Sequence, residues 1–331
     1  MSDATASPVQ AAPEAVNRLE NFPVSFFAVV MGFSGLTLAL HAMETNLELH
    51  LGLSFAAYLV TIAAFVVVAA FYLAKVVTHW GAVVHEWHHP IRLSFFPAIT
   101  ISLLLLAIIT LGYSKPAANI LWLVGMAGQG VLTIAVVSSW IGTRSFVHGH
   151  LNPAWFIPAV GNVLVPVAGA PLGYLEISWY FMAVGLFFWI VLITLVLNRL
   201  IFHDPIPGKL QPTLVIMIAP PAVSFIAWMR LHNGVLDDFA MILLNLTYLF
   251  ALIVAVQLPK ILKLPFGLPF WALSFPIAAF SIASFAYSHA SGSVFHRGLG
   301  LLGLGILLAV IAILIVKTLQ AIAAKTICVP E

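Results

Sequence analysis

The sequence predicts an all-α integral membrane protein in which ten transmembrane helices form five helical hairpins, arranged as a quasi-fivefold ring around a central pore. Composition sets the class, because 62% of the 331 residues are hydrophobic and 7% are charged, whereas soluble domains carry about 25% charged residues. Apolar stretches of ~20 residues, the length that crosses a bilayer, follow one another from about Phe26 to Thr318. Prolines fall in every second stretch, and this alternation predicts the ring of five hairpins.

The ten spans are placed by apolar runs between polar residues or Pro and Gly breaks. The first five approximate segments are 24–41, 52–75, 94–112, 119–141 and 155–170. The next five are 174–198, 213–231, 237–257, 269–288 and 298–320. Together they predict one ten-helix transmembrane domain over residues 21–322.

Lysine and arginine residues orient the predicted spans. An even number of spans puts both termini on one side, and the cations of that side are Arg18, Lys75, Arg92, Arg144, Arg199, Lys209, Lys260, Lys263, Lys317 and Lys325. The other side holds Lys115, Arg230 and Arg297. Positive residues mark the cytoplasmic side, so both termini are expected there, with 41–51 and 288–295 on the far side.

The two chain ends predict short tails outside the membrane. Residues 1–20 are rich in Ala, Pro, Ser and Gln and lack the basic start and apolar core of a cleaved signal. They predict a disordered cytoplasmic tail. Residues 323–331 predict a short cytoplasmic C-terminal tail.

Each odd-numbered span contains a proline, at Pro23, Pro97, Pro158, Pro220 and Pro276, and the predicted even-numbered segments have none in their interiors. Proline removes a backbone hydrogen bond and clashes with the preceding turn, so it bends or breaks a helix. Freed backbone groups are tolerated in a membrane where they face protein or a water-filled cavity. We therefore expect the odd helices to line an inner ring, with the even helices outside, facing lipids or partner subunits.

These five prolines recur at intervals of about 63 residues, the length of a helical hairpin with its loops. The spacing is a weak internal repeat. Because each unit contains two spans, every unit enters the membrane in the same orientation. Repeats of this kind are related by rotation about the membrane normal rather than by inversion, which predicts the quasi-fivefold ring.

Polar groups within the spans are neutral. Ionisable residues are expected in loops or at span ends, which argues against a proton relay or an acidic selectivity ring. Mid-span hydroxyls and one amide can line a path for weakly bound anions or can join packed helices, and the sequence leaves both interpretations open. The pore-lining candidates are Ser34, Thr37, Asn162, Ser224, Ser274 and Ser281, and the odd spans also carry Thr100, Ser102 and Ser284.

Other classes of function find little support in the sequence. The net charge of +2 comes without a basic block, so nucleic acid is not an expected partner. Residues 85–89 match the His-Glu-x-x-His pattern, but they are followed at once by Pro90 in an expected cytoplasmic loop, whereas a zinc site needs a regular helix and further ligands. We expect no metal, no cofactor and no catalytic residues, so the chain is not expected to be an enzyme. The single cysteine, Cys328, has no partner for an intrachain disulfide.

Five motifs resemble one known family. They are Phe22-Pro23-Val24-Ser25-Phe26-Phe27 leading to Gly32; His89-Pro90-Ile91-Arg92-Leu93-Ser94-Phe95-Phe96; Asn152-Pro153 with Val160-Gly161-Asn162; Ile218-Ala219-Pro220-Pro221; and Trp271-Ala272-Leu273-Ser274-Phe275-Pro276. Their order and content are similar to the tellurite-resistance/dicarboxylate transporter (TehA-like) family, which includes plant slow anion channels. The resemblance runs across all ten spans, and the length fits the bacterial members.

The resemblance implies a multi-pass protein of the bacterial inner membrane. It implies a homotrimer in which each protomer holds a pore inside five tilted hairpins. It also implies an anion path closed by a phenylalanine on the ninth span, and Phe275 is the residue that matches. The second-loop motif of the plant members continues into phenylalanines near the pore, so the resemblance makes Phe95 or Phe96 a possible further constriction.

Two functions therefore remain open from the sequence. The first is a passive channel for small monovalent inorganic anions such as chloride and nitrate. The alternative is a secondary transporter for C4-dicarboxylates, sulfite or tellurite-related oxyanions. An obligate carrier of a divalent acid is expected to place paired basic residues inside the spans, and the predicted spans contain none, which favours the channel.

Overall fold

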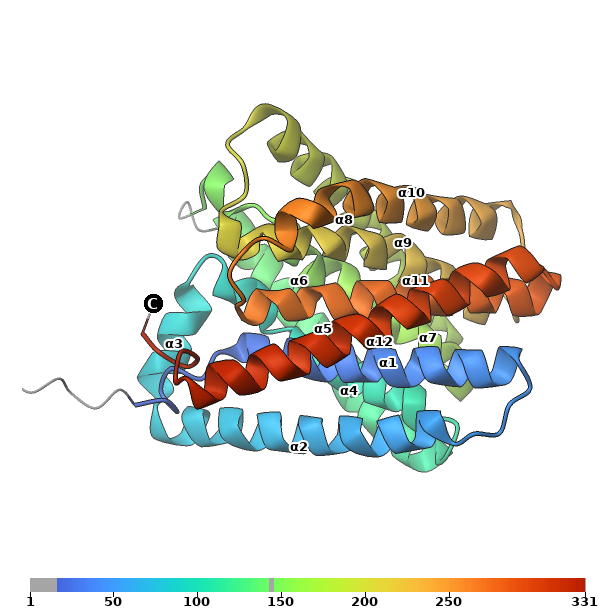
Figure 1. Ribbon diagram of the computed structural model, residues 1–331, viewed down its shortest axis with the longest axis horizontal. Coiled ribbons are helices and arrows are strands. Elements are labelled where there is room, and N and C mark those ends of the chain that lie inside the picture. The colour runs from blue at the N-terminus through green and yellow to red at the C-terminus, as the bar shows by residue number, and fades with distance from the viewer. Residues whose placement is uncertain (1–16, 143–145, 331) are drawn as a thin grey trace, which may run out of the picture.

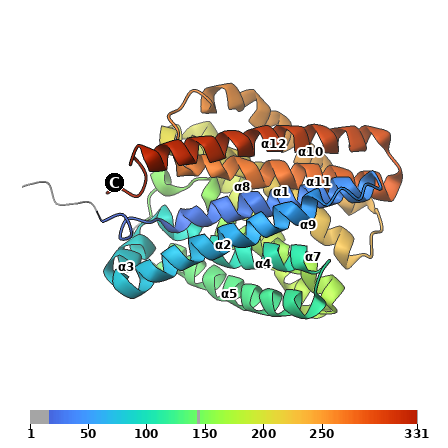
Figure 2. The same ribbon diagram turned by 60° about the horizontal axis from the view of Figure 1, so that its bottom comes forward.

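A computed structural model describes residues 17–142 and 146–330 of the chain. The regular elements of this part are helices, and ten helical stretches in it are long and apolar enough to cross a membrane. The long helices run roughly along one direction and form a single bundle (Figures 1 and 2). The ten predicted spans are confirmed, although the helices extend up to five residues beyond the predicted bounds.

The even-numbered spans are continuous α-helices of 24 to 30 residues. They are α2 (Leu53–Thr78), α5 (Lys115–Gly142), α8 (Leu175–Phe202), α10 (Asp238–Ile261) and α12 (Val294–Ala323). Pro259 lies inside α10, so the expectation that even spans have no interior proline is wrong at this position. The proline falls in the last turn of α10, where the amide hydrogen that it lacks removes one hydrogen bond from the end of the helix.

The odd-numbered spans are composite. Each joins one or more 3-10 segments to α-helix: η1 (Val24–Phe26) with α1 (Phe27–Asn46); η2 (Arg92–Phe95) with α4 (Ala98–Thr110); η4 (Pro153–Trp155), α6 (Phe156–Val160), η5 (Gly161–Leu164) and α7 (Val165–Leu172); η6 (Gly208–Ile218) with α9 (Ala219–Leu231); and η7 (Leu268–Leu273) with α11 (Ser274–Ser291). Extended 3-10 runs are uncommon, and η6 has 11 residues. Helical interruptions are therefore a property of the odd spans.

The prolines explain where these interruptions lie. Pro97 precedes α4, and Pro220 and Pro276 stand in the first turns of α9 and α11. Proline suits the first turn of a helix because the amide hydrogen that it lacks would have no partner there. Pro23 precedes η1, and Pro158 lies within the five-residue α6.

The remaining elements are α3 (Trp80–His88) and η3 (His148–His150). Residues 85–88 form the last turn of α3, so the expectation of a loop there is wrong. Pro90 disfavours helical geometry only at the residue before it, and the helix ends at His88, two residues before that proline. Among the described residues, no group of three His, Cys, Asp or Glu side chains is placed to hold a metal ion.

The two kinds of span differ in burial. In the most apolar window of each odd span 50–83% of the residues are buried, against 17–33% in the even spans. Neighbouring odd spans contact one another through α1, α4, α7, α9 and α11 in that order, and α11 packs on α1. The odd spans therefore form the interior of the bundle, and the even spans cover it.

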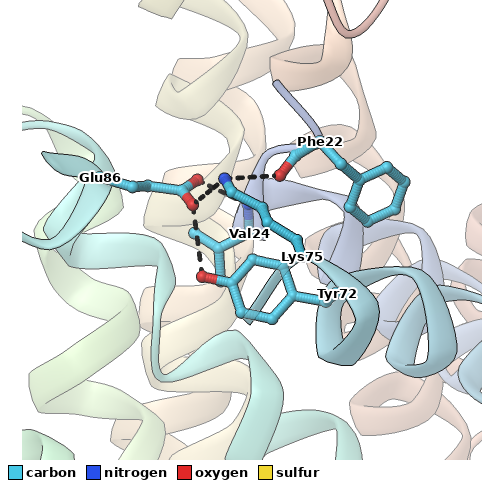
Figure 3. Close-up of polar contacts among 5 residues, drawn as sticks. All are labelled: Phe22, Val24, Tyr72, Lys75 and Glu86. Carbon is cyan, nitrogen blue, oxygen red and sulfur yellow. Dashed lines mark hydrogen bonds and ion pairs between the residues drawn. The ribbon is translucent and has the colours of Figure 1, made fainter. Parts of the chain in front are cut away.

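A buried ion pair ties the start of the first span to α2 and α3 (Figure 3). Lys75 Nζ lies 2.9 Å from Glu86 Oε2 and donates to the Phe22 carbonyl oxygen at 2.9 Å. The other carboxylate oxygen of Glu86 accepts the Val24 amide hydrogen at 2.7 Å, and the Tyr72 hydroxyl donates to Oε2 at 3.3 Å. Both charged side chains are at most 3% exposed. Water therefore stabilises neither charge, and each depends on the opposite charge of its partner.

Both ends of the described chain lie beside α3 (Figure 1). Asn17 begins a hydrogen-bonded turn and its side-chain amide donates to His79 Nε2 at 2.7 Å, so residues 17–20 of the predicted disordered tail are ordered; residues 1–16 lie outside the described part. After α12, Ile327 and Cys328 pack against the core. Burial raises the pKa of the Cys328 thiol.

Candidate functional site

A cavity of about 870 Å³ opens between the odd-numbered spans at the end of the bundle away from the termini. All five odd spans contribute to its wall. Its deep part is apolar, and its outer part carries polar side chains from the ends of α1, α9 and α11. The deep lining includes Leu38, Leu105, Ile108, Leu164, Val167, Val223, Ile226, Phe275, Ala279 and Ile282.

A second, smaller cavity of about 50 Å³ lies nearer the 3-10 segments. All five odd spans line this cavity too. Its described lining is apolar and consists of Met31, Ile101, Phe156, Ile157, Val160, Gly161, Val163, Leu164, Ile216, Ala219, Pro220, Val223 and Phe275. Of the five prolines predicted to line a pore, Pro220 is the one among these lining residues.

Phe275 borders both cavities, together with Leu164 and Val223. These three apolar residues come from η5, α9 and α11, are shared by both cavity walls, and are called the septum below. Phe275 is 9% exposed, and it is the largest of the three side chains. The Phe275 ring therefore lies beside both cavities.

The junction of η7 and α11 positions Phe275. The Ser274 hydroxyl donates to the Trp271 carbonyl oxygen at 2.7 Å, and the Trp271 indole nitrogen donates to Thr318 Oγ1 on α12 at 3.0 Å. Pro276 follows Phe275 in the first turn of α11, where the amide hydrogen that proline lacks would have no partner within the helix. On the other side α1 comes close because it has Gly35 at the contact, where an added Cβ would lie 3.4 Å from the Phe275 ring.

Three of the six predicted polar pore residues join odd spans to even spans. Thr37 pairs with Thr61 of α2 at 2.9 Å, and Asn162 contacts Thr133 of α5 at 3.0 Å. Ser281 donates to the Gly300 carbonyl oxygen of α12 at 2.8 Å. These side chains are buried and are not among the described residues that line either cavity. Their placement favours the helix-packing interpretation.

The other polar candidates are buried as well. Thr100 donates to Gln129 of α5 at 2.7 Å, and Ser102 donates within its own helix to the Ala98 carbonyl oxygen at 2.7 Å. Ser284 contacts the Tyr248 hydroxyl of α10 at 3.2 Å. The hydroxyls of Ser34 and Ser224 have no hydrogen-bond partner among the described residues. None of these candidates is among the described residues of either cavity wall.

Phe95 and Phe96 lie at the start of the third span and are 6% and 8% exposed. The Phe96 ring packs edge-on against Trp87 of α3 and Tyr72 of α2, with ring centroids 4.9 Å and 6.5 Å apart. Neither phenylalanine is among the described residues that line the two cavities. A constriction at these positions stays a prediction that this placement does not support.

The outer part of the large cavity contains residues that sequence reasoning assigned only to loops or span ends. Its polar lining consists of His41, Thr45, Asn46, Arg230, Asn233 and His289. The signal that could have identified them is positional, because His41, Arg230 and His289 all stand at the far-side ends of odd spans. If odd spans line a pore, their far-side ends surround its mouth.

Comparison with known proteins agrees with this arrangement of spans. The profile of the family described as "Voltage-dependent anion channel" matches residues 21–319, which covers all ten spans. The guard cell S-type anion channel of Arabidopsis thaliana is 25% identical over 311 residues, which are 91% of this chain and 56% of that protein. The match to that channel therefore leaves much of its length without a counterpart here.

Two prokaryotic relatives match over most of both chains. The tellurite resistance protein TehA homologue of Haemophilus influenzae is 26% identical over 271 residues, covering 81% of this chain and 82% of the relative. An uncharacterized transporter of Methanocaldococcus jannaschii is 26% identical over 285 residues, covering 79% and 83%. Relatives of this kind are channels and transporters that cross membranes. With ten apolar helical spans and a profile match across nearly all of its length, the chain belongs to the voltage-dependent anion channel family.

Proposed function

We propose that this protein is an anion channel that passes small monovalent anions such as chloride and nitrate, through a pore inside each protomer that Phe275 closes. The observation that carries the proposal is that Phe275 borders both cavities, each of which is lined by all five odd spans. Removing the ring would join two spaces that already lie along one path. The outer mouth is polar and the septum is apolar. An ion that enters the mouth therefore meets no polar group at the septum, which fits a path that is closed in this structure.

The packing of the odd spans supports the quasi-fivefold ring. The sequence of neighbours from α1 through α4, α7 and α9 to α11 returns to α1, as five rotationally related hairpins require. The lower burial of the even spans fits an outer layer that faces lipids and partner subunits. A homotrimer in the bacterial inner membrane, with both termini cytoplasmic, completes the proposal.

A phenylalanine can close such a path to ions although its side chain carries no charge. In a narrow apolar constriction an ion must keep its water shell or replace it, and the septum of Leu164, Val223 and Phe275 offers no polar group for replacement. Hydrophobic constrictions close pores in this way by excluding water. Rotation or displacement of the Phe275 side chain would widen the constriction, so that anions that have shed part of their water shell can pass.

The same chemistry predicts which anions pass. Anions that lose water easily should cross an apolar septum best, so nitrate and iodide should exceed chloride, fluoride should trail, and divalent anions should pass poorly. Reversal potentials under paired anion gradients measure this order. Sulfate or malate favoured over nitrate would contradict it.

The alternative is a carrier of C4-dicarboxylates, sulfite or tellurite-related oxyanions. Among the described residues that line the cavities, Arg230 is the one lysine or arginine, which does not provide the basic pair that a divalent acid favours. Purified wild type and Phe275→Ala in planar bilayers separate the two functions. Unitary anion currents in the variant are expected, whereas saturable dicarboxylate flux without current in both proteins would make the chain a carrier.

A further inference from the structure

The outer part of the large cavity gathers basic side chains from three different spans. Arg230 lies in the last turn of α9, His41 lies on α1, and His289 lies near the end of α11; all three line the cavity and are exposed. Thr45 and Asn233 add polar groups beside them. No Asp or Glu is among the described residues of this cavity wall, so the wall carries charge of one sign.

The acidic side chains at this end of the bundle lie outside the cavity wall. On α1, Glu44 accepts hydrogen bonds from the Leu53 amide and from Ser54 at the start of α2, and it also interacts electrostatically with His41 one turn earlier. Beyond α9, Asp237 accepts from the Ala240 amide at 2.8 Å and from the Trp228 indole nitrogen. These bonds hold the pKa of Asp237 below its ordinary value, so it stays a charged cap of α10. Glu176 on α8 is exposed and outside the lining.

Three of the other basic groups at this end are committed, and His50 and Lys115 lie outside the cavity wall. His232 contacts the Trp228 carbonyl oxygen through Nδ1 at 3.0 Å, and His296 on α12 contacts Ser293 Oγ at 2.8 Å. Arg297 donates to Asn46 Oδ1 at 2.9 Å and thereby holds that cavity-lining amide in place. Arg230, His41 and His289 are thus left as the basic groups that face the cavity.

We infer that this mouth is an anion-binding site for nitrate and halides, with Arg230 as its fixed charge and with His41 and His289 as groups that strengthen binding when the solution on that side turns acidic. The inference rests on the proposed function, because it assigns the regulation of the same path. A guanidinium group is always charged and presents several donors in one plane, which suits a planar oxyanion such as nitrate. Imidazole is the side chain whose charge changes between pH 5 and 8.

The expected effect follows from electrostatics in a solvated mouth. Each added positive charge within ~8 Å of a bound anion should strengthen binding about twofold. A mouth of one charge sign also raises the local concentration of counter-ions and the rate of entry. At ~0.05 M salt, acidification from about pH 7.5 to about pH 5.5 should therefore raise the current about threefold, and at ~1 M salt screening should remove the effect.

Excised membrane patches test the inference when each face is perfused in turn, in the Phe275→Ala background so that the septum does not limit current. We expect the current to respond to pH on one face only, the face opposite the termini. The double variant His41→Asn with His289→Asn should lose the response, and Arg230→Gln should raise the half-saturating nitrate concentration severalfold. Matched controls are His50→Asn and Lys115→Gln, which change exposed far-side residues outside the cavity wall.

A second measurement does not depend on conduction. Ligands that bind the folded state raise the unfolding temperature, so sodium nitrate should stabilise the purified wild type more at pH 5.5 than at pH 7.5, relative to sodium gluconate at equal ionic strength. Arg230→Gln should abolish this stabilisation, and Lys115→Gln should keep it. Nitrate stabilisation that is equal at both pH values, or unaffected by Arg230→Gln, overturns the inference. Normal stabilisation without current in Phe275→Ala would overturn the proposed channel instead.

Discussion

Phe275 has its position because two neighbours leave room for it and fix it. Phe275 and Pro276 are the second and third residues of α11, and Gly35 lets α1 approach the same turn. An added Cβ at Gly35 would lie 2.7 Å from the Ala278 Cβ, closer than packed carbon atoms approach. The close contact of α1 with α11 therefore depends on a missing side chain next to the septum.

A methyl group at this contact should separate the two helices. We expect Gly35→Ala to lower the free energy of unfolding by ~1 to 3 kcal/mol, the usual cost of overpacking, and to alter the current because Phe275 moves with α11. Thermal unfolding in detergent measures the first effect. Gly305→Ala is the matched control, since nothing lies within 4 Å of a Cβ at that position, and it should leave stability unchanged or slightly raised. Equal stability of the two variants would contradict the packing role of Gly35.

At the residue scale, the sequence could identify Phe275 but not the polar lining. Phe275 stands out because it precedes a proline and matches a family motif. The serines and threonines of the odd spans gave no such signal, because a hydroxyl in a membrane helix can donate its hydrogen bond to a carbonyl oxygen of a neighbouring helix. Ser281 donates to Gly300 of α12 in this way. Sequence spacing does not say which face of a broken helix points inward, so Arg230 and the two histidines were missed.

At the scale of elements, the broken odd spans require support at their starts. The first span has no α-helical turn before Phe27, and Glu86 accepts the Val24 amide hydrogen there while Lys75 binds the Phe22 carbonyl oxygen. One buried pair thus connects α2, α3 and η1 (Figure 3). This pair could not be predicted, because α3 was expected to be a loop and Lys75 was counted only as a cytoplasmic charge.

Removing one partner of this pair should cost more than removing both. Glu86→Leu alone leaves the buried Lys75 ammonium without a counter-ion and should lower the free energy of unfolding by ~3 to 5 kcal/mol. In the double variant Lys75→Met with Glu86→Leu the uncompensated charge is absent, so the loss should be smaller than in Glu86→Leu. A double-mutant cycle by denaturant unfolding in detergent measures the coupling. Additive losses would show that the two side chains act independently.

At the scale of the whole molecule, the sequence predicted the number, order and approximate bounds of the spans. Long apolar runs are the strongest signal that a chain carries, and all ten were recovered. The errors lie at span ends, since helices such as α12 continue to Ala323 past the membrane-length run. The sequence alone could not predict the two cavities, because their shape depends on how five interrupted helices pack.

The orientation of the bundle remains a prediction from its cations, of which Arg144 lies outside the described residues. Lysine and arginine concentrate at the end that carries the termini, so that end should be cytoplasmic. Thr45 lines the mouth at the opposite end and is exposed. In the Thr45→Cys variant, with Cys328→Ser to remove the native thiol, a membrane-impermeant maleimide should label intact cells. Labelling that requires lysis would reverse the orientation.

The most direct test of whether Phe275 closes the anion path is the anion conductance of a series of Phe275 variants, recorded from purified protein in bilayers. Conductance should rise as the side chain shrinks from phenylalanine through Phe275→Leu to Phe275→Ala, because less of the septum remains. Phe225→Ala is the control, since Phe225 is a fully buried phenylalanine of α9 that is not among the described residues lining either cavity. The Phe225→Ala variant should lose ~3 to 5 kcal/mol of stability without a rise in current. A folded Phe275→Ala protein whose conductance equals or falls below that of the wild type would contradict closure of the path by Phe275.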